Sequence, residues 1–142
     1  MDGIALETYN FQNFSLSILG GDIVRLESFD FEHSSDIEII TGKGGEVVGY
    51  AIKEYKRTSK ATVHFGELER LSKAAAPYSG DIVKLPPFPI IAMSEPDGRD
   101  KMKYIVPAAK TTKFGAGFKK GDTKVEVPLE FAILSQPKFL FA

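Results

Sequence analysis

Histidine, serine and acidic side chains stand close together at one point of the chain, and they are the first candidates for catalysis. His33 is followed directly by Ser34, Ser35 and Asp36, and the second histidine is His64. A hydrolytic triad needs a nucleophile exposed on a sharp strand–turn–helix connection, and no such pattern surrounds these residues. Two separated histidines also make a poor metal site unless carboxylates complete it. We therefore predict no catalytic residue and no metal site, and a hydrolase that uses one of the histidines is the weakest alternative.

Two glycine-rich segments have the composition of nucleotide-binding loops without their spacing. The segment 42–45 (Gly-Lys-Gly-Gly) is followed by Glu46, whereas a P-loop needs Ser or Thr after its lysine and a helix behind it. The glycines of segment 115–121 have the wrong spacing for a dinucleotide fingerprint, and the acidic residues between 95 and 100 lack the spacing of an EF-hand loop. These segments predict loops and turns, and no cofactor is expected.

Basic side chains gather in two places, and two interpretations of them stay open. One cluster comprises Lys53, Lys56, Arg57 and Lys60, and the other comprises Lys110, Lys113, Lys119 and Lys120. Lysines on edge strands prevent unwanted strand pairing, so the clusters could serve solubility alone. They could equally face acidic residues of a neighbouring copy, for which the candidates are Glu7, Glu27, Glu32 and Glu38.

Alternating apolar and polar residues predict strands in most of the chain. Phe14, Leu16 and Ile18 alternate with serines, and Val125 to Ile133 carries the clearest alternation. A change of phase near Glu27 predicts a β-bulge. The predicted strands are 14–18, 23–40, 56–65, 89–93, 101–106, 114–118 and 125–133.

The remaining elements are one helix and one long loop. Leu68, Leu71 and Ala75 recur at helical spacing within segment 66–76, and Pro77 ends the pattern. Segment 41–56 mixes glycine, apolar and charged residues, and we predict a long loop between two strands there. A loop of that length in a compact domain is usually functional or mobile.

Composition predicts a folded, mainly β protein. The 142 residues are 43% hydrophobic and 26% charged, which suits a single domain over residues 1–142. Several short strands at regular spacing with one helix predict a small antiparallel β-sandwich or barrel with one short flanking α-helix.

Charge and terminal patterns exclude several partners. A formal net charge of -1 offers no basic field for nucleic acid or an anionic membrane, and zero cysteines exclude disulfides and thiolate chemistry. The first ten residues lack a signal-peptide pattern, and no apolar run approaches the ~20 residues that span a bilayer. We expect a soluble product with no membrane partner.

The order of these parts resembles the tail tube proteins of phages, which are similar to the tubes of bacterial injection and type VI secretion machines. The resemblance lies in an N-terminal hairpin turned by Gly20-Gly21-Asp22, a long strand, a glycine-containing loop, a returning strand, one helix and closing strands that include Val-Glu-Val-Pro-Leu-Glu-Phe at 125–131. It covers nearly the whole chain and contains no invariant motif.

This resemblance implies a non-enzymatic structural subunit that pairs its strands with copies of itself. Six subunits would form a ring, rings would stack into a tube, and DNA would pass through without tight binding. Sheath and baseplate proteins would be partners, and the location would be the virion tail, after synthesis in the host cytoplasm. The long loop would reach the neighbouring ring.

The predicted subunit-interface residues come from that loop, its end and the apolar C-terminal segment. Phe139 and Phe141 are included because an exposed apolar tail is costly unless it docks on the domain or on a neighbour. The full set is Gly42, Gly44, Gly45, Val47, Tyr50, Ile52, Tyr55, Arg57, Phe139 and Phe141.

Several alternatives remain open at this stage. The Pro86-Pro87 stretch and the C-terminal tail depart from the family layout, so a tube-initiating or baseplate protein, or an injection-system tube protein, is an alternative to the main phage tube protein. A monomeric β-barrel that binds a small or hydrophobic ligand is the alternative from another class, and it would require a cavity inside the barrel.

Overall fold

A computed structural model describes residues 6–142 of the chain. The first five residues, where the absence of a signal-peptide pattern was partly judged, lie outside the described residues. Within the described part, no helix is long and apolar enough to cross a membrane.

The described residues form eight strands and one α-helix, which confirms the mainly β fold class with a flanking helix. The strands are β1 Phe14–Ile18, β2 Gly21–Asp22, β3 Leu26–Thr41, β4 Val47–His64, β5 Phe88–Ser94, β6 Met102–Phe114, β7 Glu126–Ile133 and β8 Lys138–Phe141. The helix α1 is Phe65–Ala74, and short 3-10 turns lie at Phe11–Asn13, Lys43–Gly45, Ala76–Tyr78 and Ile82–Lys84.

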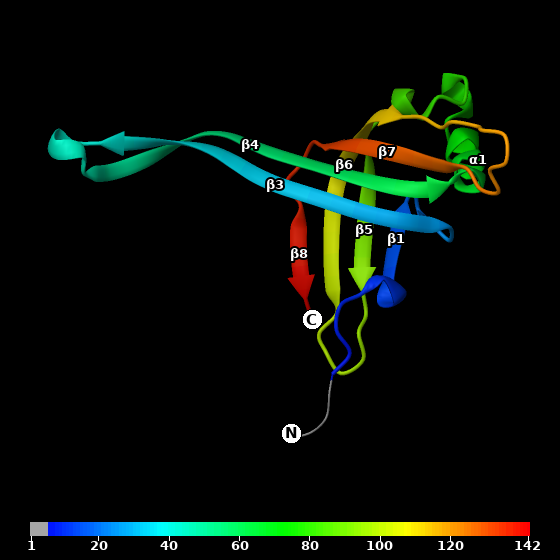
Figure 1. The fold of residues 1–142 in the computed structure, drawn as a ribbon, viewed down its shortest axis with the longest axis horizontal. Helices are drawn as coiled ribbons and strands as arrows, with labels where there is room; N and C mark the ends of the chain where they lie inside the picture. The colour runs from blue at the N-terminus through cyan, green and yellow to red at the C-terminus, as the bar shows by residue number, and fades with distance from the viewer. Residues whose placement is uncertain (1–5) are drawn as a thin grey trace.

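All strands belong to one antiparallel sheet that folds into two crossed layers. The sheet order is β2-β1-β5-β6-β7-β4-β3, and β8 also pairs with β6. The first half of β6 pairs with β5 and β8, and its second half pairs with β7. Figure 1 shows β3, β4 and β7 running across β1, β5, β6 and β8. Because β6 belongs to both layers, it joins them at one side of the sandwich.

The core lies between the layers, where alternating residues of both layers meet. Leu16, Ile90, Val106 and Val127 are fully or almost fully buried. Helix α1 covers one end of this core with Leu68 and Leu71, while its acidic first turn and basic last turn match the helix dipole.

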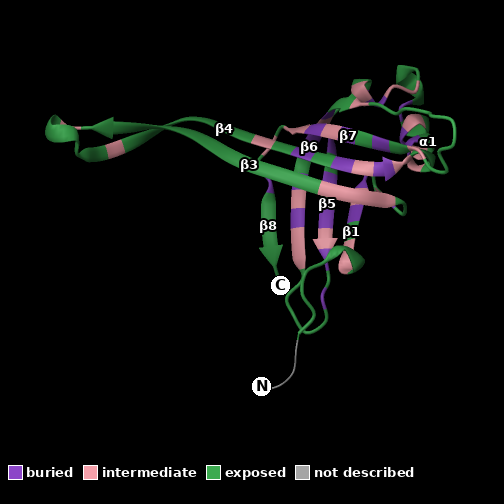
Figure 2. Ribbon diagram, viewed as in Figure 1, coloured by how far each residue is buried: buried purple, intermediate pink, exposed green. Residues whose placement is uncertain are grey.

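The β3–β4 hairpin extends far beyond the sandwich as an arm, and this corrects the prediction of a long loop over 41–56. Only a short turn separates Thr41, the end of β3, from Val47, the start of β4. Figure 1 shows the arm projecting past β8, and Figure 2 shows it as almost entirely exposed. The loop was predicted because β4 holds extra residues at Val48 and Lys53, which shift the apolar phase and hide its period of two.

Other predictions were confirmed or corrected. The strand 14–18 and the bulge at Glu27 are present as predicted. The predicted strand 114–118 is wrong, because β6 ends at Phe114 and the glycines after it form a loop. The C-terminal segment is strand β8, which pairs with β6 over four residues. Strand β1 also pairs with β5, which is distant from it in the chain, so the strand order does not follow the sequence order.

Candidate subunit interface

One face of the arm is apolar and has no covering element among the described residues. From Ser28 to Thr41 each residue of β3 has a partner in β4, so every second residue of β3 shares a face with its partners. This arm apolar face comprises Ile37, Ile39, Val47, Tyr50, Ile52 and Tyr55.

The exposure of this face is high for side chains of this size. Ile39 is 59% exposed, Tyr50 is 67% exposed and Val47 is 69% exposed. A two-stranded hairpin is marginally stable by itself in water, and an exposed apolar patch of this kind is typical of interaction surfaces. The arm therefore has the physical character of an interface element.

The same face continues into the core of the sandwich. Phe29 and Phe31 lie on it closer to the body, where their partners in β4 are Ala61 and Ser59, both buried. Phe29 stacks on Phe14 of β1. At the body this face is thus covered by the layer of β1, β5, β6 and β8, and along the arm it is uncovered.

Glycines form the tip of the arm because the turn needs backbone angles that other residues rarely adopt. Gly44 and Gly45 have φ values of 84° and 83°, in the left-handed region. The Gly42 amide donates to the Glu46 carbonyl at 2.7 Å and closes the turn. These three predicted glycines therefore shape the tip, and their contact with a neighbour stays a prediction.

Two polar contacts join the arm to the body at His33 and Arg57, and we call this part of the hairpin the arm root. The Tyr104 hydroxyl lies 2.7 Å from Nε2 of His33, and Arg57, paired with His33 across the hairpin, donates to Gln136 at 3.0 Å. The Arg57 guanidinium also lies 5.1 Å from the centre of the Tyr55 ring. These contacts join the arm to β6 and to the segment before β8.

Electrostatics at the root favour a neutral histidine. Burial, and then the positive charge of Arg57, lower the pKa of His33 below its usual 6.5. Burial raises the pKa of Tyr104 to about 12. Neutral His33 can therefore accept the hydrogen bond that the Tyr104 hydroxyl donates.

The two predicted aromatic residues of the C-terminal segment pack on their own chain. Phe139 stacks on Tyr104 with ring centres 4.5 Å apart, and Phe141 meets Tyr9 edge to face at 6.3 Å. Both rings stay partly exposed, at 42% and 58%. β8 thus completes the layer beside the arm root.

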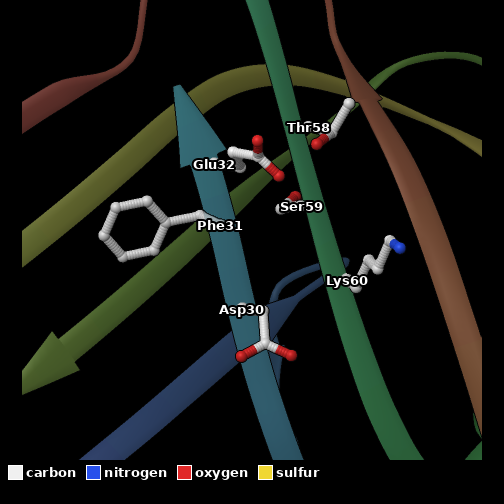
Figure 3. A pocket seen from close by; sticks show the side chains of 6 residues that line it. All are labelled: Asp30, Phe31, Glu32, Thr58, Ser59 and Lys60. Atoms are coloured by element: carbon white, nitrogen blue, oxygen red, sulfur yellow. The ribbon is translucent and has the colours of Figure 1, made fainter. Parts of the chain in front are cut away.

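The opposite face of the β3–β4–β7 layer is polar and carries a row of alternating charges. Asp30 pairs with Lys60, Lys60 with Glu130, and Glu130 with Lys113 across four neighbouring strands. Lys60 and Glu130 form a salt bridge at 3.3 Å. Figure 3 shows Asp30, Glu32, Thr58 and Lys60 on this part of the layer, with the Phe31 ring turned away from them.

The ends of this charge row lie at two strand edges that lack a partner strand within residues 6–142. β3 pairs only with β4, so Asp30 stands at one edge. Beyond Ala109, β6 pairs only with β7, so Lys113 stands at the other edge. Near this edge, Lys110 donates to the carbonyl of Val83 in the turn Ile82–Lys84 at 2.8 Å. One edge is therefore acidic and the other basic.

The histidines lie apart and in different surroundings. His64 bonds to Glu27, whose carboxylate also accepts from Lys124 at 3.2 Å, so this cluster ties the last loop to the sheet. His33 lies at the arm root, and strand alternation puts Ser34 and Asp36 on the opposite face from it. Among the described residues, no group of His, Cys, Asp or Glu side chains could hold a metal ion.

The sandwich interior leaves little space for a ligand. The hollow between Ile18, Leu71 and Phe131 measures about 10 Å³, about the volume that one water centre requires. This filled core weighs against a ligand-binding barrel, whose interior would have to hold a cavity of several hundred Å³.

Sequence reasoning found part of this surface. Val47, Tyr50, Ile52, Tyr55 and Arg57 all fall on the face that continues into the core. It missed Ile37 and Ile39, although their alternation with Glu38 is visible in the sequence, because they were assigned to a strand inside the domain. The charge row could not be predicted from the sequence, because it joins residues that are far apart in the chain.

Comparison with known proteins identifies the fold. Neither the protein-family models nor the curated proteins contain a match to the chain. Among solved structures, a chain of the extended sheath–tube complex of the PVC extracellular contractile injection system matches with a TM-score of 0.71 at 12% identity, covering 95% of this chain and 93% of that one.

Two further structures share the fold. A chain of the anti-feeding prophage tube-terminating cap matches with a TM-score of 0.70 at 12% identity, covering 99% of this chain and 97% of that one. A chain of the tail of an empty gene transfer agent particle, refined with C6 symmetry, matches with a TM-score of 0.58 at 10% identity, covering 94% and 99%. The fold that the resemblance to tail tube proteins implied is therefore confirmed.

Proposed function

We propose that the chain is a non-enzymatic structural subunit whose copies form stacked rings, most simply hexameric, that make a tail-type tube. The observation that supports this best is the pair of complementary edges. β3 offers Asp30 at one end of the four-strand layer β6–β7–β4–β3, and β6 offers Lys113 at the other. Unpaired strand edges are templates for pairing with another chain.

Strand direction supports closure of such a ring. The four strands alternate in direction, because each neighbouring pair is antiparallel. An even number of alternating strands lets β3 of one copy meet β6 of the next in antiparallel pairing without any break. Each copy would repeat the same contact by rotation, and a heterologous contact that closes gives a ring.

In this arrangement the polar face of the layer lines the channel. Its other face is covered by β1, β5, the first half of β6 and β8, so these elements lie outside the channel wall (Figure 1). With six copies the barrel has about 24 strands, well above the 16–18 at which barrels already hold an aqueous channel. Asp30, Lys60, Glu130 and Lys113 alternate in sign, so DNA would pass without tight binding.

The arm supplies contacts between rings in this proposal. The arm projects along the strand direction away from the body, and no part of the described chain covers its apolar face (Figure 2). Burial of that face on the adjoining ring would remove Ile39 and Tyr50 from water. The expected location is the virion tail or a related injection particle, with sheath and baseplate proteins as further partners.

A second candidate is a subunit that ends or initiates the tube. The similarity to the anti-feeding prophage cap is nearly as strong as that to the sheath–tube complex. A main tube subunit should form long tubes when pure, whereas an end subunit should stop at single or paired rings. Negative-stain electron microscopy of the purified protein distinguishes the two.

The ring contact itself is tested with paired cysteines, because the chain contains none. The variant Asp30→Cys/Lys113→Cys should give a ladder of disulfide-linked multimers on mild oxidation, and its largest band counts the copies in a ring. Each single variant should give no ladder, and a mixture of the two should stop at dimers, because the contact joins different edges. The double variant Glu32→Cys/Lys113→Cys tests the same contact between β3 and β6 in a register that is shifted by two residues along β3. Monomers from both double variants, with no rings in the microscope, would refute the proposal.

A further inference from the structure

Two consecutive prolines, Pro86 and Pro87, directly precede β5 and depart from the tail tube layout. Both are exposed, whereas the residues on either side of them, Leu85 and Phe88, are each only 6% exposed. The prolines therefore contribute little to the core, and their main effect is on the backbone. A proline has no N–H group and cannot donate to a strand ladder.

The free part of the β6 edge begins where β5 stops covering it. The first residue of β5, Phe88, lies opposite Ala109 of β6. Ala109 also pairs with Ile133 of β7, so β5 and β7 lie on opposite edges of β6. Over residues 110–114 only the β7 edge has a partner strand within residues 6–142. We call the other edge of residues 110–114 the free β6 edge.

The prolines prevent β5 from covering the free β6 edge. In the register of the pair Phe88 and Ala109, a longer β5 would place Pro87 opposite Lys110 and Pro86 opposite Thr111. Neighbouring residues of a strand direct their N–H groups to opposite edges, so one of two consecutive residues always faces the partner strand. In either phase a proline would stand where the ladder needs a donor, and β5 cannot begin earlier than it does.

The residues before the prolines also have no free N–H group for β6. The N–H groups of residues 83 to 85 are all used around the turn Ile82–Lys84. The carboxylate and the carbonyl of Asp81 accept from the first two at 3.1 Å and 3.0 Å, and the Ile82 carbonyl accepts from the third at 3.3 Å. Because buried or paired backbone donors are rarely left to compete for a second partner, segment 83–87 offers no donor to β6.

Lys110 holds the acceptors of the same segment. Its ammonium group donates to the carbonyl of Val83 at 2.8 Å and to the carbonyl of Leu85. These carbonyls are groups that a longer β5 would need for pairing with β6. The side chain of the first residue of the free β6 edge thus keeps the preceding segment in its turn conformation.

We infer that Pro86 and Pro87 determine the specificity of ring assembly, because they keep the free β6 edge open for β3 of the next copy. The inference rests on the proposed function, in which that edge meets β3 at each seam. A chain without the two prolines would be able to pair β5 with the start of this edge inside one copy. Such pairing needs no second molecule, so it would compete with the seam most strongly at low protein concentration.

Replacement of both prolines by strand-forming residues tests the inference. Pro86→Val/Pro87→Thr restores two N–H groups, and β5 should lengthen across Lys110 and Thr111. Each seam then loses one or two ladder hydrogen bonds, so rings should need at least about tenfold more protein to form. Sedimentation velocity over a range of concentrations measures this change. The control Pro77→Val removes an exposed proline from the turn Ala76–Tyr78 in the same connection and should assemble like the parent.

Amide hydrogen exchange of dilute monomer shows whether the edge has been covered. In the parent, the amide of segment 110–111 that faces away from β7 should exchange fast, and in the double variant it should be protected. If the double variant does not fold, Pro86→Ala/Pro87→Ala restores the same N–H groups with a weaker strand preference and takes its place.

Two results would overturn the inference. One is a folded double variant that forms rings at the parent's concentration, and the other is loss of rings while the edge amide still exchanges fast. Absence of rings from the parent itself would refute the proposed function. The exchange comparison between the two monomers would still test whether the prolines keep the edge open.

Discussion

At the scale of single residues, the pair His33 and Tyr104 is one of the contacts that join the arm to the body. The Tyr104 side chain is fully buried, and His33 provides the partner of its hydroxyl. A buried hydroxyl without a partner costs about 1–3 kcal/mol. Phe31 and Phe139 stack on the Tyr104 ring from β3 and β8, so the contact lies where three elements meet.

The first prediction is a loss of stability on mild acidification. The pKa of His33 is lowered in the folded protein, so the unfolded chain binds a proton first as pH falls below 6.5. The state that binds more protons gains free energy, and the free energy of unfolding therefore falls as pH decreases through and below that value. Urea unfolding at pH 8 and pH 5.5 should show this decrease.

The variant His33→Phe keeps an aromatic ring and removes the titrating group. It should be less stable than the parent at pH 8, because the Tyr104 hydroxyl loses its acceptor. Its stability should change less between pH 8 and pH 5.5 than that of the parent. Identical pH dependence in the two proteins would show that His33 is not the group responsible.

Glu27 should cause a second decrease in the free energy of unfolding, at a lower pH than the decrease caused by His33. The hydrogen bond from His64, followed by that from Lys124, lowers the pKa of Glu27 below 4.5. The unfolded chain again takes up the proton first, so this stabilisation is present above pH 4.5 and is lost as pH falls through the lower folded value. Glu27→Gln should flatten the stability profile below pH 4.5 and leave the decrease from pH 8 to pH 5.5 unchanged.

At the scale of elements, the arm turn gives a prediction about backbone conformation. Gly45 has a positive φ, and a β-branched residue there costs about 1–2 kcal/mol. Gly45→Val should loosen the arm, seen as faster amide exchange in β3 beyond Asp36, with little change in the body. Gly49→Ala is the control, because Gly49 lies in β4 without positive φ and with open space at its Cβ position.

The arm as a whole should be dispensable for folding and necessary for stacking. Replacing residues 37–53 by Asn-Gly joins Asp36 to Glu54, which are already paired, through a two-residue turn. The buried core residues are untouched, so we expect unfolding like that of the parent, rings in the microscope and no long tubes. The control Ile40→Ser alters the opposite face of the arm and should still stack. Normal tubes from the shortened variant would refute the role of the arm.

Local sequence patterns predicted the strands in which apolar and polar residues alternate without interruption. The strand 14–18 and the bulge at Glu27 follow from an alternation that is visible within a few residues. The arm was missed because the extra residues Val48 and Lys53 interrupt the alternation in β4. Segment 114–118 was assigned wrongly, because two phenylalanines suggested a strand where the glycines favour a loop.

At the scale of the whole molecule, strand order and edge identity could not be predicted from local patterns. Strand pairing in a sheet joins distant residues, and nothing in the alternation of β3 specifies that its second edge has no partner strand within residues 6–142. The candidate interface was therefore only partly predictable. The residues of the arm were named, whereas the complementary edges at Asp30 and Lys113 required the register of four strands.

The last prediction concerns the charge at the proposed ring seam. Lys113→Glu places an acidic side chain opposite the acidic β3 edge of the next copy, and within its own chain it lies beside Glu130. An exposed charge pair contributes about 0.2–1 kcal/mol, so folding should change little. The effect recurs at every seam, and a ring closes only when all seams form, so assembly should weaken far more than folding. Sedimentation velocity should show monomer at low salt and partial recovery of rings at high salt, because salt screens the like charges. Lys120→Glu makes the same charge change in the neighbouring loop and should assemble normally. Rings of Lys113→Glu that match the parent at low salt would mean that β6 is not the edge that meets β3.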